Sequence, residues 1–520
     1  MSKQFVFNPQ SARPVATAPG ADSLFVCFVG ELFCPFQFWN FRFSITAFIS
    51  DTTRLKLLNM AVRVVKKNRA RRSAGARAVT PARRCAFTVL QRVEEDGAFA
   101  AVLLAHATAE LRADDRALCY ELTLGVLRRQ LWLDKLIEHY AGRDSGQIDA
   151  PVRRALRLGL YQLRFLSRVP ASAAVNESVN LSHAARPGAA AKFVNAVLRR
   201  ATREPVFDPA AQISDDIERL AVEISHPRWL VERWTAAFGA DEAAAFAHAN
   251  NLTPPVAFRA NEWRAPVAEV MAQLREAGIR VTPSGVAPGA WRIEGTGGSA
   301  ASVRELMRAG AIYTQDEASQ LVAHVLGAGA GERVLDVCSA PGSKATHIAG
   351  LVGADAFVVA GDLRAHRLRV VVEAAGKQNL HNIHVVALDA RAAMPFPDVS
   401  FDRVLVDAPC SGTGTLRHNP EIRWRITPDD IAELSARQQQ ILTHAAPVVR
   451  PGGRLVYSTC SIEPEENEAV IARFLATHEN FRQEPVNAPA HFLTETGAAR
   501  TWPHRGGTDG FFIAALKRKS

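Results

Sequence analysis

The chain has 520 residues, and its 48% hydrophobic and 22% charged residues exclude a protein that is disordered throughout. This length predicts about two to four domains. The formal net charge of +10 is concentrated in residues 60–84, which hold nine Lys and Arg and no acid, so the chain beyond residue 84 is close to neutral. The charge therefore predicts a basic arm and not a basic protein surface.

The first 59 residues differ in composition from the rest. Residues 24–49 hold eight of the 26 Phe of the chain, and Glu31 and Arg42 interrupt that run. No uncharged span of about 18 residues exists there, and no basic segment or small-residue cleavage site marks a signal peptide. We expect 1–59 to be a non-native or disordered extension with Met60 as the start. A weak membrane-interface segment is the alternative. The arm at 60–84 is either an RNA-phosphate-binding tail or a solvated linker.

Residues 85–203 predict an all-helical domain. Apolar residues recur at helical spacing through 114–140, 151–166, 173–185 and 191–201, without the alternation of strands. The helical pattern alone predicts a helical bundle with a partner-binding role.

A proline-containing linker at 204–212 precedes a mixed unit at 213–315. Helical patterns at 225–251, 267–279 and 302–310 alternate with short strands at 255–261 and 291–295. This order predicts a small α+β module, similar to a ferredoxin-like RNA-recognition module.

Residues 316–520 predict a doubly wound α/β fold. The buried strands are expected at 333–337, 356–362, 383–389, 401–409 and 453–460. In such sheets ligands bind where parallel strands end. At those ends lie carboxylates and thiols, namely Asp336, Cys338, Asp362, Asp389, Asp407, Cys410 and Cys460. We therefore predict a functional edge.

The segment DVCSAPGSKATHIAG (336–350) predicts a ligand-binding loop, because Gly342 allows close approach and a helix N-terminus follows. It matches neither GxGxxG nor the triphosphate-binding GxxxxGK[ST] pattern. Asp362 could accept both ribose hydroxyls of an adenosine, and Asp389 could accept from the adenine amino group. S-adenosylmethionine carries an adenosine and has no pyrophosphate, so it is the ligand that these features predict.

Two cysteines at the strand ends indicate the class of reaction. Cys410 lies in DAPCSGTG (407–414) and Cys460 in YSTCS (457–461). A buried structural cysteine is the ordinary alternative for each. Carbon C5 of cytosine becomes nucleophilic when a thiolate adds at C6 while an acid protonates N3, and a second thiol can assist release. The seven cysteines are odd in number and never at CxxC spacing, which argues against a disulfide scaffold or a zinc site and favours the reducing cytoplasm.

These motifs resemble the NOL1/NOP2/Sun family of RNA cytosine-C5 methyltransferases. The matching segments are DVCSAPGSKATHIA, DAPCSGTGTLRHNPEIRW, LVYSTCSIEPEENE, YTQDEASQ and PHRGGTDGFFIAAL. Residues 81–201 resemble the RNA-binding factor NusB, and that fusion marks a bacterial subgroup acting on 16S ribosomal RNA. Ser339, Ser343 and Ala345 depart from the usual residues of the donor loop.

The resemblance implies that Cys460 is the nucleophile, Cys410 assists release, Asp407 contacts the base and Lys344 is the active-site lysine. It implies S-adenosylmethionine bound by Cys338, Ser339, Ala340, Pro341, Gly342, Ser343, Lys344, Asp362, Asp389 and Asp407. It further implies a cytoplasmic protein, expected to be a monomer, with 16S ribosomal RNA as partner, no metal and no membrane.

Two other functions are compatible with the sequence. One is an RNA-binding protein that keeps the methyltransferase fold only as a scaffold, although such scaffolds typically lose the nucleophile or the donor loop. The other keeps the chemistry but acts on tRNA or on another rRNA cytosine. Methylation of an exocyclic amine is disfavoured, because DAPC stands where an NPPY-like tetrapeptide is expected.

Overall fold

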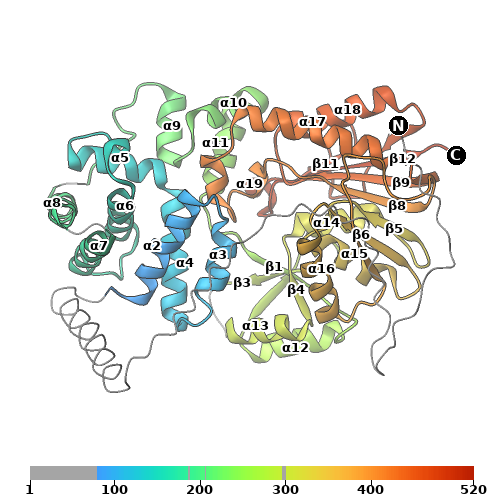
Figure 1. Ribbon diagram of the computed structural model, residues 1–520, viewed down its shortest axis with the longest axis horizontal. Helices are drawn as coiled ribbons and strands as arrows, with labels where there is room; N and C mark the ends of the chain where they lie inside the picture. The colour runs from blue at the N-terminus through green and yellow to red at the C-terminus, as the bar shows by residue number, and fades with distance from the viewer. Residues whose placement is uncertain (1–78, 186–187, 205, 296–299) are drawn as a thin grey trace, which may run out of the picture.

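The computed structural model describes residues 79–520 except 186–187, 205 and 296–299. The expectations for 1–59, and for 60–84 as far as residue 78, lie outside the described residues. The three expected parts are present: a helical bundle, a small α+β module and an α/β domain (Figure 1). Among the described residues, no helix combines the length and apolar character needed to cross a membrane.

The bundle buries one apolar face of each of its helices. The helices are α2 (Pro81–Glu95), α3 (Ala100–Ala107), α4 (Ala113–Arg128), α5 (Gln130–Ala141), α6 (Ala150–Phe165), α7 (Ala171–Ala185) and α8 (Ala189–Arg203). Leu90, Leu122, Leu136, Leu158 and Leu198 are fully or almost fully buried in one cluster. The helical pattern over 114–140 is divided at Arg129, where the backbone leaves the helical conformation (φ −113°, ψ 18°).

Three short helices link the bundle to the module: α9 (Asp216–Ile224), α10 (Arg228–Phe238) and α11 (Ala240–Ala249). The pattern over 225–251 is broken at Gly239, whose φ of 85° favours glycine. Trp234 and Phe246 of these helices pack with Ile462 and Trp502 of the α/β domain. The linking helices therefore lie directly beside the segment that follows Cys460.

The module has a βαββαβ order. Its elements are β1 (Val256–Ala260), α12 (Val267–Glu276), β2 (Arg280–Pro283), β3 (Ala290–Glu294), α13 (Ala300–Ala309) and β4 (Ile312–Thr314), in an antiparallel sheet ordered β2-β3-β1-β4. Strands β2 and β4 are too short to show in the sequence pattern.

Alternation along β1 and β3 gives this sheet two different faces. Phe258 packs with Val270 and Leu274 of α12. Its neighbour Arg259 points the other way and donates to Thr346 Oγ1 in the α/β domain at 3.0 Å. Arg292 on β3 likewise donates to Glu317 Oε2 at 2.6 Å. The sheet thus lies between its own helices and the α/β domain.

The α/β domain contains the expected parallel strands β5 (Arg333–Asp336), β6 (Phe357–Asp362), β7 (Ile383–Ala387), β8 (Phe401–Asp407) and β9 (Val449–Thr459). Three further strands were not expected: β10 (Phe481–Glu484), β11 (Ala499–Arg500) and β12 (Phe512–Arg518). The sheet order is β10-β12-β9-β8-β5-β6-β7, β11 pairs with β12, and β12 runs antiparallel to β9.

Helices cover both faces of this sheet. Val334 on β5 packs with α14 (Glu317–Leu326), α15 (Ser343–Val352) and α16 (Ala365–Gln378). Leu335 packs toward α17 (Pro428–Ala445) and α18 (Glu468–Thr477). The two helical layers are visible on either side of the strands in Figure 1.

The bundle contacts the α/β domain through the 3-10 helix η3 (Pro420–Trp424), which lies shortly after Cys410. Trp424 donates from its indole to the carbonyl of Leu127 at 3.0 Å, and Glu421 accepts the N–H of Ala100 at 2.8 Å. Arg425 donates to three backbone carbonyls at the end of α2, those of Val93, Gly97 and Ala98.

Candidate active site

The carboxyl edge of the parallel sheet brings most of the expected side chains together. Strands β5, β8 and β9 are neighbours, so Asp336, Asp407 and Cys460 follow one another across the edge. The loop after β8 returns Cys410 to the same place. The Sγ atoms of Cys410 and Cys460 are 3.3 Å apart, and both cysteines are free thiols.

Asp407 lies between a lysine and a serine. Its Oδ2 accepts from Lys344 Nζ at 2.7 Å, and its Oδ1 accepts from Ser458 Oγ at 2.7 Å. Burial alone would lower the pKa of Lys344, but the charge and hydrogen bond of Asp407, with smaller contributions from Cys460 and Asp336, raise it overall. Lys344 is therefore an ammonium ion at neutral pH, close to Cys460.

The loop after β5 packs closely against α16 and the end of β6. Gly342 has φ 101°, and a Cβ there would lie 3.1 Å from Val371 Cα, so a side chain at this position would be strained. Ser339 N donates to Gly361 O, and Gly342 N donates to Ser339 O, each at 2.7 Å. These bonds hold residues 338–344 across the ends of β5 and β6.

Two polar atoms under this loop have no partner among the described residues: Asp336 Oδ2 and Ser339 Oγ, both buried. Burial, and then the charge of Asp407, raises the pKa of Asp336 to about 8. Burial, and then the charge of Asp336, raises the pKa of the Cys338 thiol. Asp336 is thus protonated at neutral pH, and a polar ligand would satisfy the unpaired atoms.

The two other expected donor-binding acids differ in their surroundings. Asp362 is 5% exposed at the end of β6 and forms an ion pair with Arg367 (3.3 Å), which also donates to Ala340 O. Asp389 follows β7, is more exposed, and is held by the Arg391 side chain at 3.0 and 2.8 Å. Those hydrogen bonds lower the pKa of Asp389. The structure brings Asp362 to the loop, whereas the described contacts of Asp389 are with Arg391.

Glu466, which was not among the predicted site residues, is a fully buried carboxylate between the two cysteine loops. Its Oε1 accepts from Ser411 N at 2.9 Å and from Gln438 Nε2 at 2.8 Å. Its Oε2 accepts from the hydroxyls of Ser411 and Ser461, each at 2.5 Å. Burial raises the pKa of Glu466, although all these donors act against the increase. Glu466 lies in the matching segment LVYSTCSIEPEENE, but the run PEENE (464–468) reads as an exposed acidic loop, so the sequence does not show that this carboxylate is buried.

A second polar cluster lies nearby. Ligand atoms of Asp316, His418 and Asp509 lie within 4.8 Å of one another, a spacing that could hold a metal ion. Their oxygens already have partners, because Asp316 accepts from the hydroxyl of Thr508 and Asp509 accepts from Arg417. The expectation of no metal stays a prediction.

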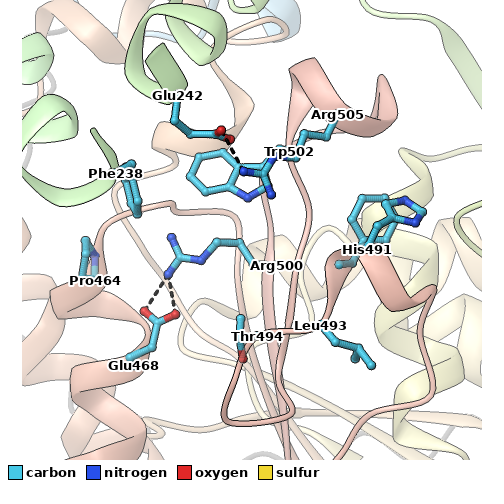
Figure 2. A pocket seen from close by; sticks show the side chains of 11 residues that line it. Phe238, Glu242, Pro464, Glu468, His491, Leu493, Thr494, Arg500, Trp502 and Arg505 are labelled. Carbon is cyan, nitrogen blue, oxygen red and sulfur yellow. Dashed lines mark hydrogen bonds and ion pairs between the residues drawn. The ribbon is translucent and has the colours of Figure 1, made fainter. Parts of the chain in front are cut away.

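A pocket of about 460 Å³ has Pro464 and Glu468, from the segment after Cys460, in its wall (Figure 2). Phe238 and Trp502 line it with two pairs of opposite charge. Arg500 donates to both oxygens of Glu468 at 2.6 Å, and Arg505 lies 2.7 Å from Glu242. Both arginines of the pocket wall are therefore paired with a carboxylate of the same wall.

The parallel sheet with its antiparallel strand β12, and the loop and acids at its carboxyl edge, define a Rossmann-like methyltransferase. Three family models match the chain, one in each of the three parts described above. Residues 323–517 match 16S rRNA methyltransferase RsmB/F, residues 80–203 match the NusB family, and residues 226–298 match the ferredoxin-like domain of RsmF/B-like methyltransferases.

Two curated relatives match along most of their length. The protein named probable ribosomal RNA small subunit methyltransferase B of Bacillus subtilis is 36% identical over 451 residues, covering 85% of this chain and 99% of the relative. The protein named ribosomal RNA small subunit methyltransferase B of Pseudomonas putida is 37% identical over 406 residues, covering 77% and 90%.

Two solved structures have a similar fold. The crystal structure of PH0851 has a TM-score of 0.74 at 28% identity and covers 85% of this chain and all of its own. A methyltransferase homolog from Pyrococcus horikoshii has a TM-score of 0.52 at 27% identity, covering 59% of this chain and all of its own. The chain belongs to the NusB-fused RsmB/F family of 16S rRNA methyltransferases, which makes it an S-adenosylmethionine-dependent rRNA methyltransferase.

Proposed function

We propose that the protein transfers a methyl group from S-adenosylmethionine to C5 of a cytosine in 16S ribosomal RNA, with Cys460 as the covalent nucleophile and Cys410 assisting release. The observation that carries this proposal is the pair of thiols 3.3 Å apart beside the Lys344–Asp407 ion pair. Methylation at oxygen or at an exocyclic amine needs no nucleophilic thiol, whereas C5 of cytosine does.

The residues of the donor loop fit S-adenosylmethionine. We assign it to residues 338–344 with Asp362, Asp389 and Asp407. The unpaired buried atoms of Asp336 and Ser339 support this assignment. Bound there, S-adenosylmethionine supplies an electrophilic methyl group.

The side chains at the carboxyl edge of the sheet carry out the steps at the cytosine. The Cys460 thiolate forms a bond to C6 of the cytosine, and the displaced electron pair moves toward N3, where a proton is taken up. We assign the contact with the base to Asp407, which is held by Lys344 and Ser458. C5 then accepts the methyl group and loses its proton. The electron pair of the broken C5–H bond forms the C5–C6 double bond, the pair of the Sγ–C6 bond returns to sulfur, and N3 releases to solvent the proton that it had taken up. Cys410 is the neighbouring group that assists this step.

The two cysteines give a direct test. Cys410→Ala should accumulate a protein–RNA adduct that survives a denaturing gel, because addition proceeds and release fails. Cys460→Ala should form none. An adduct with Cys460→Ala instead would reverse the two roles. Mapping 5-methylcytosine in 16S ribosomal RNA and in tRNA, with and without the protein, tests the substrate. An unchanged 16S map, or a mark lost from tRNA instead, would refute 16S ribosomal RNA as the substrate.

A further inference from the structure

A cavity of about 890 Å³ lies between the ferredoxin-like module and the helices α14 and α15 of the methyltransferase domain. The module contributes Arg259 of β1 and Trp263, and the methyltransferase domain contributes His324 of α14 and His347 of α15. None of these residues belongs to the donor loop or to the two cysteine loops. The proposed methylation therefore gives this cavity no role.

Arg259 brings a buried positive charge to the cavity. The residue is 5% exposed, and its guanidinium donates to Gln315 Oε1 at 3.2 Å and to Thr346 Oγ1 at 3.0 Å. Both acceptors are neutral, and so is the ring of Tyr313 beneath the guanidinium. No carboxylate of the described residues forms an ion pair with Arg259. A buried cation without a counter-ion is costly, which favours an anion as the ligand.

His347 is a second polar group of the cavity that lacks a partner. The residue is 6% exposed, and its Nδ1 is buried without a hydrogen bond to any described residue. The ring of His324 packs edge-on against it, with 5.2 Å between the ring centroids. The Nε2 atom of His324 is likewise buried and unpaired in the described part of the chain. Because buried polar atoms in native proteins are nearly always paired, the two imidazoles indicate a polar ligand that the chain itself does not supply.

The rest of the wall suits a flat apolar group. Trp263 and Leu351 line it, and the indole N–H of Trp263 donates to Gly350 O at 3.1 Å, which fixes the ring. Glu262 is the one carboxylate among the lining residues, and it is exposed. Small-molecule sites commonly have volumes of about 300–1,000 Å³, so the cavity has the size of such a site.

We propose that this cavity binds a small phosphate ester, with the phosphate at Arg259, His324 and His347 and a ring-shaped apolar group against Trp263. A phosphate monoester offers three terminal oxygens, so the guanidinium and both imidazoles can each meet an acceptor, whereas a carboxylate offers only two. The site is separate from the methyl-transfer chemistry and does not depend on it.

Calorimetric titration of the full chain tests the proposal. S-adenosylhomocysteine, the donor without its methyl group, is present throughout so that the donor site is occupied. Phenyl phosphate should bind at one site per chain. Inorganic phosphate lacks the ring, phenol lacks the phosphate and benzoate lacks the third oxygen, so each should bind at least about tenfold more weakly.

Variants of the wall locate the binding site. His347→Phe keeps a ring but removes its nitrogens, and it should raise the Kd about tenfold, as expected for one lost hydrogen bond to a charged group. Leu351 is 48% exposed, so it can be replaced without disturbing the core. Leu351→Glu adds a negative charge to the wall and should weaken binding, whereas Leu351→Gln, of the same shape, should not. His384→Phe, outside the cavity, is the control for the histidine variant.

Two results would overturn the proposal. One is wild-type protein that binds phenyl phosphate no more tightly than inorganic phosphate, which requires no variant to fold. The other is a Leu351→Glu variant, folded by circular dichroism, with the same affinity as Leu351→Gln. Displacement of phenyl phosphate by a 16S ribosomal RNA transcript would overturn the small ester and assign the phosphate to RNA. Failure of Cys410→Ala to trap RNA would refute the methylation chemistry and leave these titrations unaffected.

Discussion

Gly414 lies where three chain segments meet behind the two cysteines. Its N–H donates to Cys460 O, and its carbonyl accepts from Gly510 N, both at 2.9 Å. A Cβ at this position would lie 1.9 Å from Gly510 O and 2.9 Å from Cys460 O. Both are backbone atoms, so no side chain can rotate away, and the variant Gly414→Ala must move one loop relative to the other.

The cost of Gly414→Ala follows from these contacts. Overpacking costs about 1–3 kcal/mol, and weakening the two hydrogen bonds adds about 1 kcal/mol each. We expect the free energy of unfolding to fall by about 3–5 kcal/mol, measured by guanidinium denaturation. Because a misplacement of about 1 Å can reduce a rate about 100-fold, methyl transfer should fall by at least that factor in the protein that remains folded.

Gly350→Ala is the matched control. Gly350 lies within α15, and a Cβ there would meet nothing within 4 Å. The same substitution should therefore stabilise the protein by about 0.5–1 kcal/mol, through helix propensity. A Gly414→Ala variant within about 0.5 kcal/mol of the wild type would refute the packing argument.

Two further predictions concern titration and oxidation. Asp336 has a pKa of about 8 against 3.8 unperturbed, so the folded state holds a proton that the unfolded state releases, and stability falls as pH rises from about 4 to about 8. Asp336→Asn should remove that loss, which is up to about 6 kcal/mol, and melting curves across this pH range measure it. Parallel pH curves for both proteins would contradict the reasoning. Because the Cys410 and Cys460 sulfurs are 3.3 Å apart against about 2.05 Å in a disulfide, mild peroxide should join them and abolish methyl transfer until dithiothreitol is added. Non-reducing peptide mass spectrometry detects the crosslink, and lost activity with both thiols still free would disprove it.

The sequence predicted the features that depend on neighbouring residues in one strand. Continuous apolar runs such as RVLDV identify strands buried on both faces, and the ends of those strands identify Asp336 and Asp407. Strand β12 was missed although FFIAAL (511–516) has a strand-like composition, because it runs antiparallel at the far side of β9. Its position depends on a pairing that no local pattern reports.

The features that escaped prediction depend on residues distant in the chain. Glu466 contacts Ser411, 55 positions away, and only the folded loops make it a shared acceptor. The ion pair of Lys344 with Asp407 joins positions 63 apart. The helical pattern over 225–251 is broken at Gly239, and glycine is a local signal for such a break. The break at Arg129 has no local signal in the sequence.

The position of the module's sheet has a consequence for RNA recognition. RNA-recognition modules commonly stack unpaired bases on aromatic side chains of an open sheet face. Here the corresponding face is closed: Tyr313 lies beneath the guanidinium of Arg259 at 4.7 Å, and Arg259 and Arg292 bind Thr346 and Glu317 of the methyltransferase domain. Single-stranded bases therefore have no stacking platform on these strands. Any contact of the module with a nucleic acid must come from its helices, its loops or its edge strand.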